Sequence, residues 1–154
     1  MGKLTSKDTP LAEITLRKYE RPFDLERREL IKKLCLSLGL LQPGDSRDVV
    51  VDVFQVIVDC KEPLTAEQII EEVIKNRDRY RLPQAGVAGS NVRRQIRRIK
   101  EIFLVEKAGN RYRIAENASL LEIFEEKIEK FYLRTIVDRV KEYLEAVKKS
   151  GSPQ

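Results

Sequence analysis

The sequence contains no histidine and no tryptophan, and it has only one methionine and two cysteines. Without histidine, neither a histidine-based acid–base mechanism nor the usual zinc-ligand sets can be assembled. Cys35 and Cys60 show no Cys-x-x-Cys spacing, so we expect two reduced, buried thiols in helices. A disulfide is the alternative, since intracellular proteins of hyperthermophiles form them. No nucleophile–base set emerges either, and we expect no enzymatic activity, no cofactor and no metal site.

Long apolar runs are also missing, because Asp or Gln interrupts each of them. No signal peptide and no segment of membrane-spanning length is visible, so we expect a cytoplasmic protein without membrane contact. Charged residues instead make up 36% of the chain. The abundance of Lys, Glu and Arg favours a thermophilic source.

The net charge of +5 over 154 residues is modest, but its distribution is uneven. Residues 75–113 carry twelve Lys or Arg and three acidic residues, a net charge of +9, so the rest of the chain sums to −4. A basic region on a mildly acidic body indicates a polyanionic partner for one face only.

The centre of this basic region, residues 90–102, has the apolar spacing of an amphipathic helix. Its apolar residues recur at intervals of four, three and three: Val92, Ile96, Ile99 and Ile102. The opposite face carries polar and basic residues: Ser90, Asn91, Arg94, Arg97 and Arg98. No acidic residue balances these arginines before Glu101, as i, i+4 partners on a solvated face usually would. Arg93 lies nearer the core edge and is expected to meet the DNA backbone or an acid.

A short strand, a Gly109-Asn110 turn and a second short strand follow this helix. Alternation puts Tyr112 on one side of the second strand, and Arg111 and Arg113 on the other. A basic amphipathic helix followed by a basic hairpin is what a winged helix-turn-helix DNA reader needs.

The stretch IRRIKEIFLVEK, residues 96–107, resembles the recognition helix and wing of the winged helix-turn-helix superfamily, and LTAEQII, residues 64–70, is similar to the start of its second helix. The resemblance covers residues 45–115. It implies that the helix at 90–102 enters the major groove of DNA. Two departures stand out. The family usually has glycine where Phe103 stands, at the left-handed end of the helix, and the segment 77–89 is longer than a tight turn.

Three further helices are expected upstream of this stretch. Asp24 would cap a helix that ends at Gly39 and buries Leu30 and Leu34. Thr65 and Gln68 form a capping box for a helix that fades near residue 76, followed by a basic loop over residues 77–89.

Between these two helices, the run at residues 47–59 is rich in β-branched residues and has strand propensity. Its polar residues instead recur at intervals of four, three and four, as on a helix with one narrow polar stripe: Asp48, Asp52, Gln55 and Asp59. We therefore predict a helix that is capped by Asp45 or Ser46 and packed on more than one side.

The longest helix is expected at residues 119–149, opened by a Ser119/Glu122 capping box. Its apolar stripe has steps averaging about 3.7 residues: Leu121, Phe124, Ile128, Tyr132, Ile136, Val140, Tyr143 and Val147. The helix either covers its own domain or pairs with a symmetry mate. The family resemblance implies the dimer, and the average step favours a crossing over a limited patch instead of a long zipper.

The sequence thus predicts a mostly α fold with a small β-hairpin. We expect a disordered tail (1–10), an N-terminal helical extension (11–44), a winged helix-turn-helix domain (45–116) and a C-terminal dimerisation helix (117–150). The expected function is sequence-specific binding of double-stranded DNA by a homodimeric transcriptional regulator, with no small-molecule ligand evident. The alternative is a winged-helix protein-interaction or assembly subunit without sequence-specific DNA readout, whose basic face meets an acidic partner or nucleic-acid machinery.

The predicted DNA-contacting residues come from the helix and from the wing: Ser90, Asn91, Arg94, Arg97, Arg98, Lys107, Arg111 and Arg113. Arg94 and Arg97 point most directly away from the apolar face. The wing residues Lys107, Arg111 and Arg113 could equally be ordinary exposed charges of a hairpin.

Overall fold

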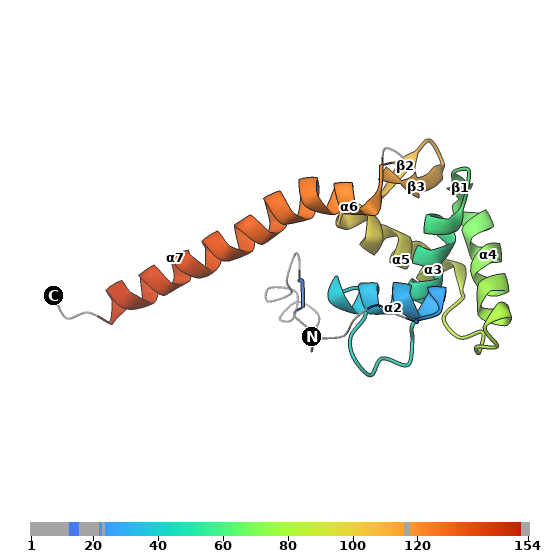
Figure 1. Cartoon of the computed structure of the whole chain (residues 1–154), viewed down its shortest axis with the longest axis horizontal. Helices are drawn as coiled ribbons and strands as arrows, with labels where there is room; N and C mark the ends of the chain where they lie inside the picture. The colour runs from blue at the N-terminus through green and yellow to red at the C-terminus, as the bar shows by residue number, and fades with distance from the viewer. Residues whose placement is uncertain (1–12, 16–21, 23, 116–117, 152–154) are drawn as a thin grey trace.

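The computed structural model describes residues 13–15, 22, 24–115 and 118–151, and the predicted disordered tail lies outside this part. The elements are, in order, α2 (Arg27–Ser37), α3 (Val49–Asp59), β1 (Leu64–Thr65), α4 (Ala66–Arg79), α5 (Gly89–Glu101), β2 (Val105–Ala108), β3 (Arg111–Ile114), α6 (Leu120–Ile123), the π-helical segment η2 (Phe124–Leu133) and α7 (Arg134–Ser150). The prediction of a mostly helical chain with a small hairpin is confirmed (Figure 1).

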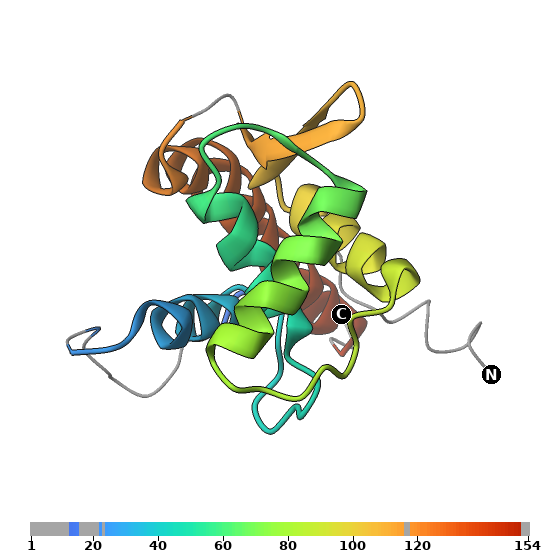
Figure 2. The same cartoon turned by 90° about the vertical axis from the view of Figure 1, so that its right-hand side faces the viewer.

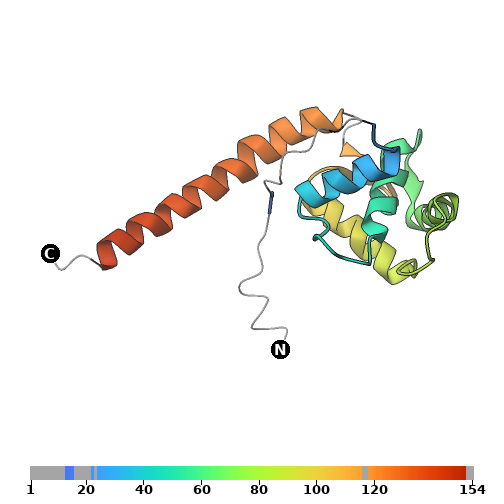
Figure 3. The same ribbon diagram turned by 60° about the horizontal axis from the view of Figure 1, so that its bottom comes forward.

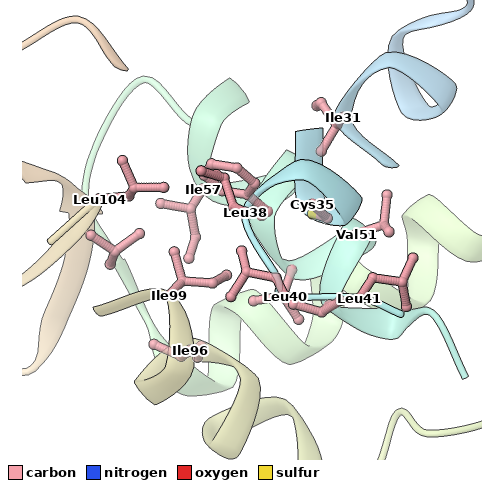
Figure 4. Close-up of a cluster of buried hydrophobic side chains, with 14 of the residues drawn as sticks. Ile31, Cys35, Leu38, Leu40, Leu41, Val51, Ile57, Ile96, Ile99 and Leu104 are labelled. Atoms are coloured by element: carbon pink, nitrogen blue, oxygen red, sulfur yellow. The ribbon is translucent and has the colours of Figure 1, made fainter. Parts of the chain in front are cut away.

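Helix α3 lies at the centre of the fold and packs against α2, α4 and α5. The prediction of a helix over the strand propensity of this run is confirmed, and Val51, Val53 and Phe54 are fully buried. Figure 4 shows side chains from α2, α3 and α5 meeting with Leu38, Leu40 and Leu41 in one core. The N-terminal helix therefore shares its core with the elements that follow it.

The middle of the polar stripe of α3, Asp52 and Gln55, is buried, whereas Asp59 at its end is exposed. Asp52 is 0% exposed and accepts hydrogen bonds from Arg28 Nε and Nη2 at 3.0 and 2.9 Å. It also accepts from Arg77 Nη1 at 2.7 Å and from Asn76 Nδ2 at 2.9 Å. Asp48 pairs with the same two guanidinium groups, at 3.2 and 3.0 Å. Helices α2 and α4 are thus joined through the carboxylates of α3.

Two of the predicted helix starts are wrong. Asp24 does not cap α2, which begins at Arg27 after an N-cap residue, Glu26, that makes no side-chain cap. Neither Asp45 nor Ser46 caps α3, whose N-cap residue is Asp48. The carboxylate of Asp48 is engaged by buried arginines and does not cap its own helix.

The predicted inner face of α2 is also partly wrong. Ile31 and Cys35 are buried, but Leu30 and Leu34 are 36% and 37% exposed. The buried position beside Ile31 is taken by Arg28, whose partners lie on α3. Because the guanidinium of Arg28 contacts Asp52, the face of α2 that carries Arg28 is turned toward α3. Leu30 and Leu34 then lie at the surface.

The capping box of α4 is confirmed, since Thr65 and Gln68 exchange their side-chain-to-backbone hydrogen bonds at 3.2 and 2.9 Å. Ser119 likewise accepts from the amide of Glu122 at 3.1 Å, but the Glu122 carboxylate accepts from the Ser119 hydroxyl and not from its backbone.

The predicted hairpin is confirmed, and it forms a three-stranded antiparallel sheet with β1, a strand that the sequence analysis missed. The strand order is β1-β3-β2, with Leu64 opposite Tyr112 and Val105 opposite Ile114. Gly109 takes a φ of 66° at the turn. Figure 2 looks onto α4, with α5 beside it and the hairpin above.

Phe103, which stands where the family usually has glycine, does adopt the left-handed conformation, with a φ of 67°. Its ring stacks on Tyr132 of η2 at a centroid distance of 5.6 Å, and Lys127 Nζ lies 5.8 Å from the ring centroid. A left-handed non-glycine residue costs about 1–2 kcal/mol. The aromatic contacts that glycine could not make offset this cost.

In the C-terminal helical run, the apolar residues of η2 recur at a different interval from those of α7. In η2 the stripe advances in steps of four, through Phe124, Ile128 and Tyr132, which matches the wider turn of a π-helix. This half packs against the core, with Ile128 buried and Tyr132 Oη donating to the Glu101 carbonyl at 3.2 Å.

Helix α7 runs away from the rest of the molecule (Figures 1 and 3), and none of its residues is buried. Its large apolar residues are between 50% and 68% exposed: Val137, Val140, Tyr143, Leu144 and Val147. The helix therefore does not cover its own domain. Within the described part of the chain, no helix is long and apolar enough to cross a membrane.

Replacing Asp52 with alanine tests the role of the buried carboxylate, because it leaves the guanidinium groups of Arg28 and Arg77 with Asp48 alone. Breaking a buried pair in this way costs about 3–5 kcal/mol, and urea denaturation should show the free energy of unfolding falling by that amount. The matched control is Asp59→Ala, which removes an exposed pair with Arg27 and should cost less than about 1 kcal/mol. Equal losses in the two variants would contradict the role given to Asp52.

Candidate nucleic-acid interface

Helix α5 holds its basic residues outward because its apolar residues are anchored in the core. Val92, Ile96 and Ile99 are at most 2% exposed. Arg94 and Arg97 lie on the exposed side of the helix, and no carboxylate of the described residues forms a salt bridge with either. These two guanidinium groups are therefore available to an external anion, as the sequence analysis expects. Ser90 is exposed at the start of the helix.

Asn91 and Arg98, on the same helix, are engaged by the protein itself. Asn91 Nδ2 donates to the Gly86 carbonyl at 2.7 Å, and its side-chain oxygen accepts from Gln95 at 3.2 Å. Arg98 is half-buried and donates to Gln95 Oε1 at 2.7 Å and to the Gly39 carbonyl at 3.5 Å. Burial, and then the charge of Arg94, hold the pKa of Arg98 below its ordinary value.

Other arginines of the basic segment are already neutralised. Arg93 pairs with Glu67 of α4 at 2.6 Å, which confirms the expectation that it meets an acid. Arg77, assigned from sequence to a basic loop, lies in α4 and is buried between Asp48 and Asp52. Position in a basic run is thus a poor guide to which charges face solvent.

The predicted wing residues are placed differently from one another. Lys107 is exposed, with its Nζ 5.8 Å from the centroid of the Tyr112 ring. Arg111 is exposed and donates to the Pro63 carbonyl at 3.3 Å and to Gln68 Oε1 at 3.4 Å, both neutral acceptors. Arg113 pairs with Glu106, its Nε donating at 2.6 Å. Lys107 and Arg111 therefore keep an unneutralised charge on the hairpin.

The structure adds one basic residue that the sequence analysis missed. Arg47 precedes α3 and lines a cavity of about 340 Å³ together with Arg94 and Arg98 of α5. The two segments are distant in sequence and meet only because α5 packs on α3. No local pattern could have joined them.

The other side of α3 and α4 has the opposite charge. A depression between the end of α3 and α4 is lined by four carboxylates and two cations, a net negative charge: Asp59, Glu62, Glu71 and Glu72, with Lys61 and Arg79. A polyanion would be repelled from this side, so the basic side formed by α5 is electrostatically distinct.

The thiols and the metal-ligating side chains supply no further site. Cys35 is buried in α2, and burial raises the pKa of its thiol to about 12. Cys60 is only half-buried, beyond the end of α3, so the expectation of two buried helical thiols is confirmed for Cys35 alone; neither is disulfide-bonded. Among the described residues, no cluster of three or more His, Cys, Asp or Glu could hold a metal ion.

Comparisons with protein-family models, with curated proteins and with solved structures found no match for this chain.

The contacts of α5 distinguish Asn91, whose side chain bonds within the fold, from Arg94 and Arg97, whose side chains do not. Asn91→Ala removes the hydrogen bond to Gly86 and an acceptor for Gln95, and should lower the free energy of unfolding by about 1–2 kcal/mol. Arg94→Ala and Arg97→Ala should each change it by less than about 0.5 kcal/mol, because neither side chain forms a hydrogen bond or salt bridge with the described part of the chain. Thermal or urea denaturation of the three variants measures the difference, and equal effects would contradict this division.

Proposed function

We propose that this chain is a winged helix-turn-helix protein that binds double-stranded DNA, with α5 in the major groove and the β2–β3 hairpin as the wing. The observation that supports this proposal most directly is the pair of exposed guanidinium groups of Arg94 and Arg97. Neither is paired with a carboxylate of the described residues, and the opposite face of their helix is anchored in the core. The order helix, strand, helix, helix and hairpin, with β3 between β1 and β2, supports the resemblance that the sequence suggests.

The two sets of free charges have different proposed roles. Arg94 and Arg97 would reach base edges, because an arginine fork pairs with guanine O6 and N7 in the major groove. Lys107 and Arg111 lie on a hairpin beyond the helix and would meet phosphates, which fix orientation but carry no sequence information. Arg113 and Asn91 would act through the protein's own structure, given their partners Glu106 and Gly86.

We further propose that the protein acts as a homodimeric transcriptional regulator that pairs through α7. The apolar stripe within α7 advances in steps of four, three and four: Ile136, Val140, Tyr143 and Val147. The mean step is about 3.7, nearer to the 3.6 of a straight helix than to the 3.5 of a left-handed coiled coil. A crossing of the two α7 helices over a limited patch is thus a better proposal than a long coiled coil.

Duplex binding should be carried largely by phosphate contacts, so the affinity should fall steeply with salt. With about five to eight phosphates neutralised per dimer, the slope of log K against log salt would be on the order of −5 to −7. Arg94→Ala and Arg97→Ala should each weaken binding to a selected site by roughly 1–3 kcal/mol. Lys107→Ala and Arg111→Ala should weaken all sequences alike and flatten the slope.

The control for these four variants is Lys75→Ala, which removes an exposed cation that pairs with Glu72 away from α5. Fluorescence anisotropy with a random duplex and with a site selected from a random pool measures both effects. No binding to any duplex at low salt would refute the proposal and favour an acidic protein partner for α5.

Val140→Asp should convert a dimer into a monomer, because it places a charge in the middle of the proposed α7 seam. The matched control is Thr135→Asp, which adds the same charge outside the apolar stripe of α7 and should leave the dimer intact. Light scattering at micromolar concentration gives the mass of each variant. A wild-type protein of one chain mass would rule out the dimer.

A further inference from the structure

The cavity that Arg47, Arg94 and Arg98 line has a composition unlike the rest of the surface. It lies between the segment at residues 40–47, the first turn of α3 and the exposed side of α5. Three guanidinium groups and a single carboxylate, that of Asp45, line its wall. Asp45 is itself engaged, since its Oδ2 accepts from the amide of Gln42 at 3.1 Å.

The positive charge of this cavity exceeds its negative charge, because the single carboxylate of Asp45 faces three guanidinium groups. Within the part of the chain that the structure describes, no carboxylate pairs with Arg47 or Arg94. Arg98 is half-buried, yet among the described residues it donates hydrogen bonds only to the neutral oxygens of Gln95 and Gly39. A desolvated cation without an opposite charge is costly to maintain, and an incoming anion would remove that cost.

Arg28 provides a comparison within the same molecule. It is buried, whereas Arg98 is half-buried, and it meets the carboxylates of Asp52 and Asp48. Burial lowers the pKa of Arg28, and the two carboxylates outweigh that effect and raise it. In Arg98, burial and the neighbouring Arg94 lower the pKa instead. The fold therefore supplies counter-ions to Arg28 and leaves Arg98 beside an open cavity.

We propose that this cavity is a binding site for a phosphoryl group. Guanidinium forks match the geometry of phosphate oxygens and form charge-assisted hydrogen bonds with them. Val49 and Val50 bring the first turn of α3 to the same cavity, so the positive end of that helix adds to the attraction. The cavity volume of about 340 Å³ suits a phosphate with a small substituent.

The phosphoryl group belongs either to a free small molecule or to the backbone of duplex DNA. Only the second of these two sources rests on the proposed function. Arg94 both lines the cavity and lies on the exposed side of α5. A free phosphate bound there would neutralise a charge that the duplex needs. In that case the ligand would compete with DNA.

The experiment titrates the full-length protein with inorganic phosphate and with a nucleoside monophosphate, and follows the ³¹P signal by NMR. Arg47→Gln, in an exposed segment, and Arg98→Lys, which keeps the charge but loses the fork, should each weaken binding about tenfold. Lys100→Gln is the control, because Lys100 is an exposed residue of α5 that does not line the cavity, and its loss should change affinity little. Circular dichroism confirms that each variant folds.

A second arm measures duplex affinity against salt for the same proteins. Phosphate binding that depends on Arg47 and Arg98 supports the site and a free ligand, and added phosphate should then release DNA more than chloride at equal ionic strength. No free-phosphate binding, but a salt slope reduced by about one in Arg47→Gln, supports the site with DNA as its source.

The proposal is overturned if neither phosphate binding nor the duplex salt slope changes in Arg47→Gln and Arg98→Lys. If the wild-type protein binds no duplex at all, the proposed function fails and the phosphate titration alone decides for or against the cavity.

Discussion

The carboxylate of Asp52 is the constraint on which the rest of this structure depends. It is fully buried and is held by guanidinium groups from both flanking helices, α2 and α4. A buried ion pair gives little net stability, but removing one partner leaves the others desolvated and unpaired. The network therefore specifies how α2 and α4 lie on α3. It also explains why α2 exposes Leu30 and Leu34 instead of burying them.

The same network divides the arginines of this chain into two groups. Arg28 and Arg77 are paired with the buried carboxylate of Asp52, and Arg93 is paired with Glu67 at the surface. Because α3 is fixed from both sides, α5 packs on it with one face and presents Arg94 and Arg97 on the other. The net basic charge of the segment is thus less informative than the location of its unpaired members. Those on α5 and on the hairpin lie away from the carboxylates between α3 and α4, whereas Arg79 lines the depression that holds these carboxylates.

Features governed by local periodicity or capping were predictable from the sequence, including the helical nature of α3, the Thr65 cap and the turn at Gly109. Partners supplied by tertiary packing were not. Asp52 and Arg77 have the residue types of a solvated face, and only the approach of α2 and α4 makes them a core. For the candidate site, the exposure of Arg94 and Arg97 followed from the helical period. The engagement of Asn91 and Arg98, and the meeting of Arg47 with α5, required the fold.

The central claim is that the basic side formed by α5 and the hairpin meets duplex DNA. The most direct test is a titration of isotope-labelled protein with a short duplex, followed by the backbone amide chemical shifts. The account predicts that the largest changes fall on residues 90–98, on the hairpin around Lys107 and Arg111, and on Arg47, while the acidic side of α4 around Glu71 stays unchanged. Changes confined to α7, or spread evenly over both sides of the molecule, would contradict it.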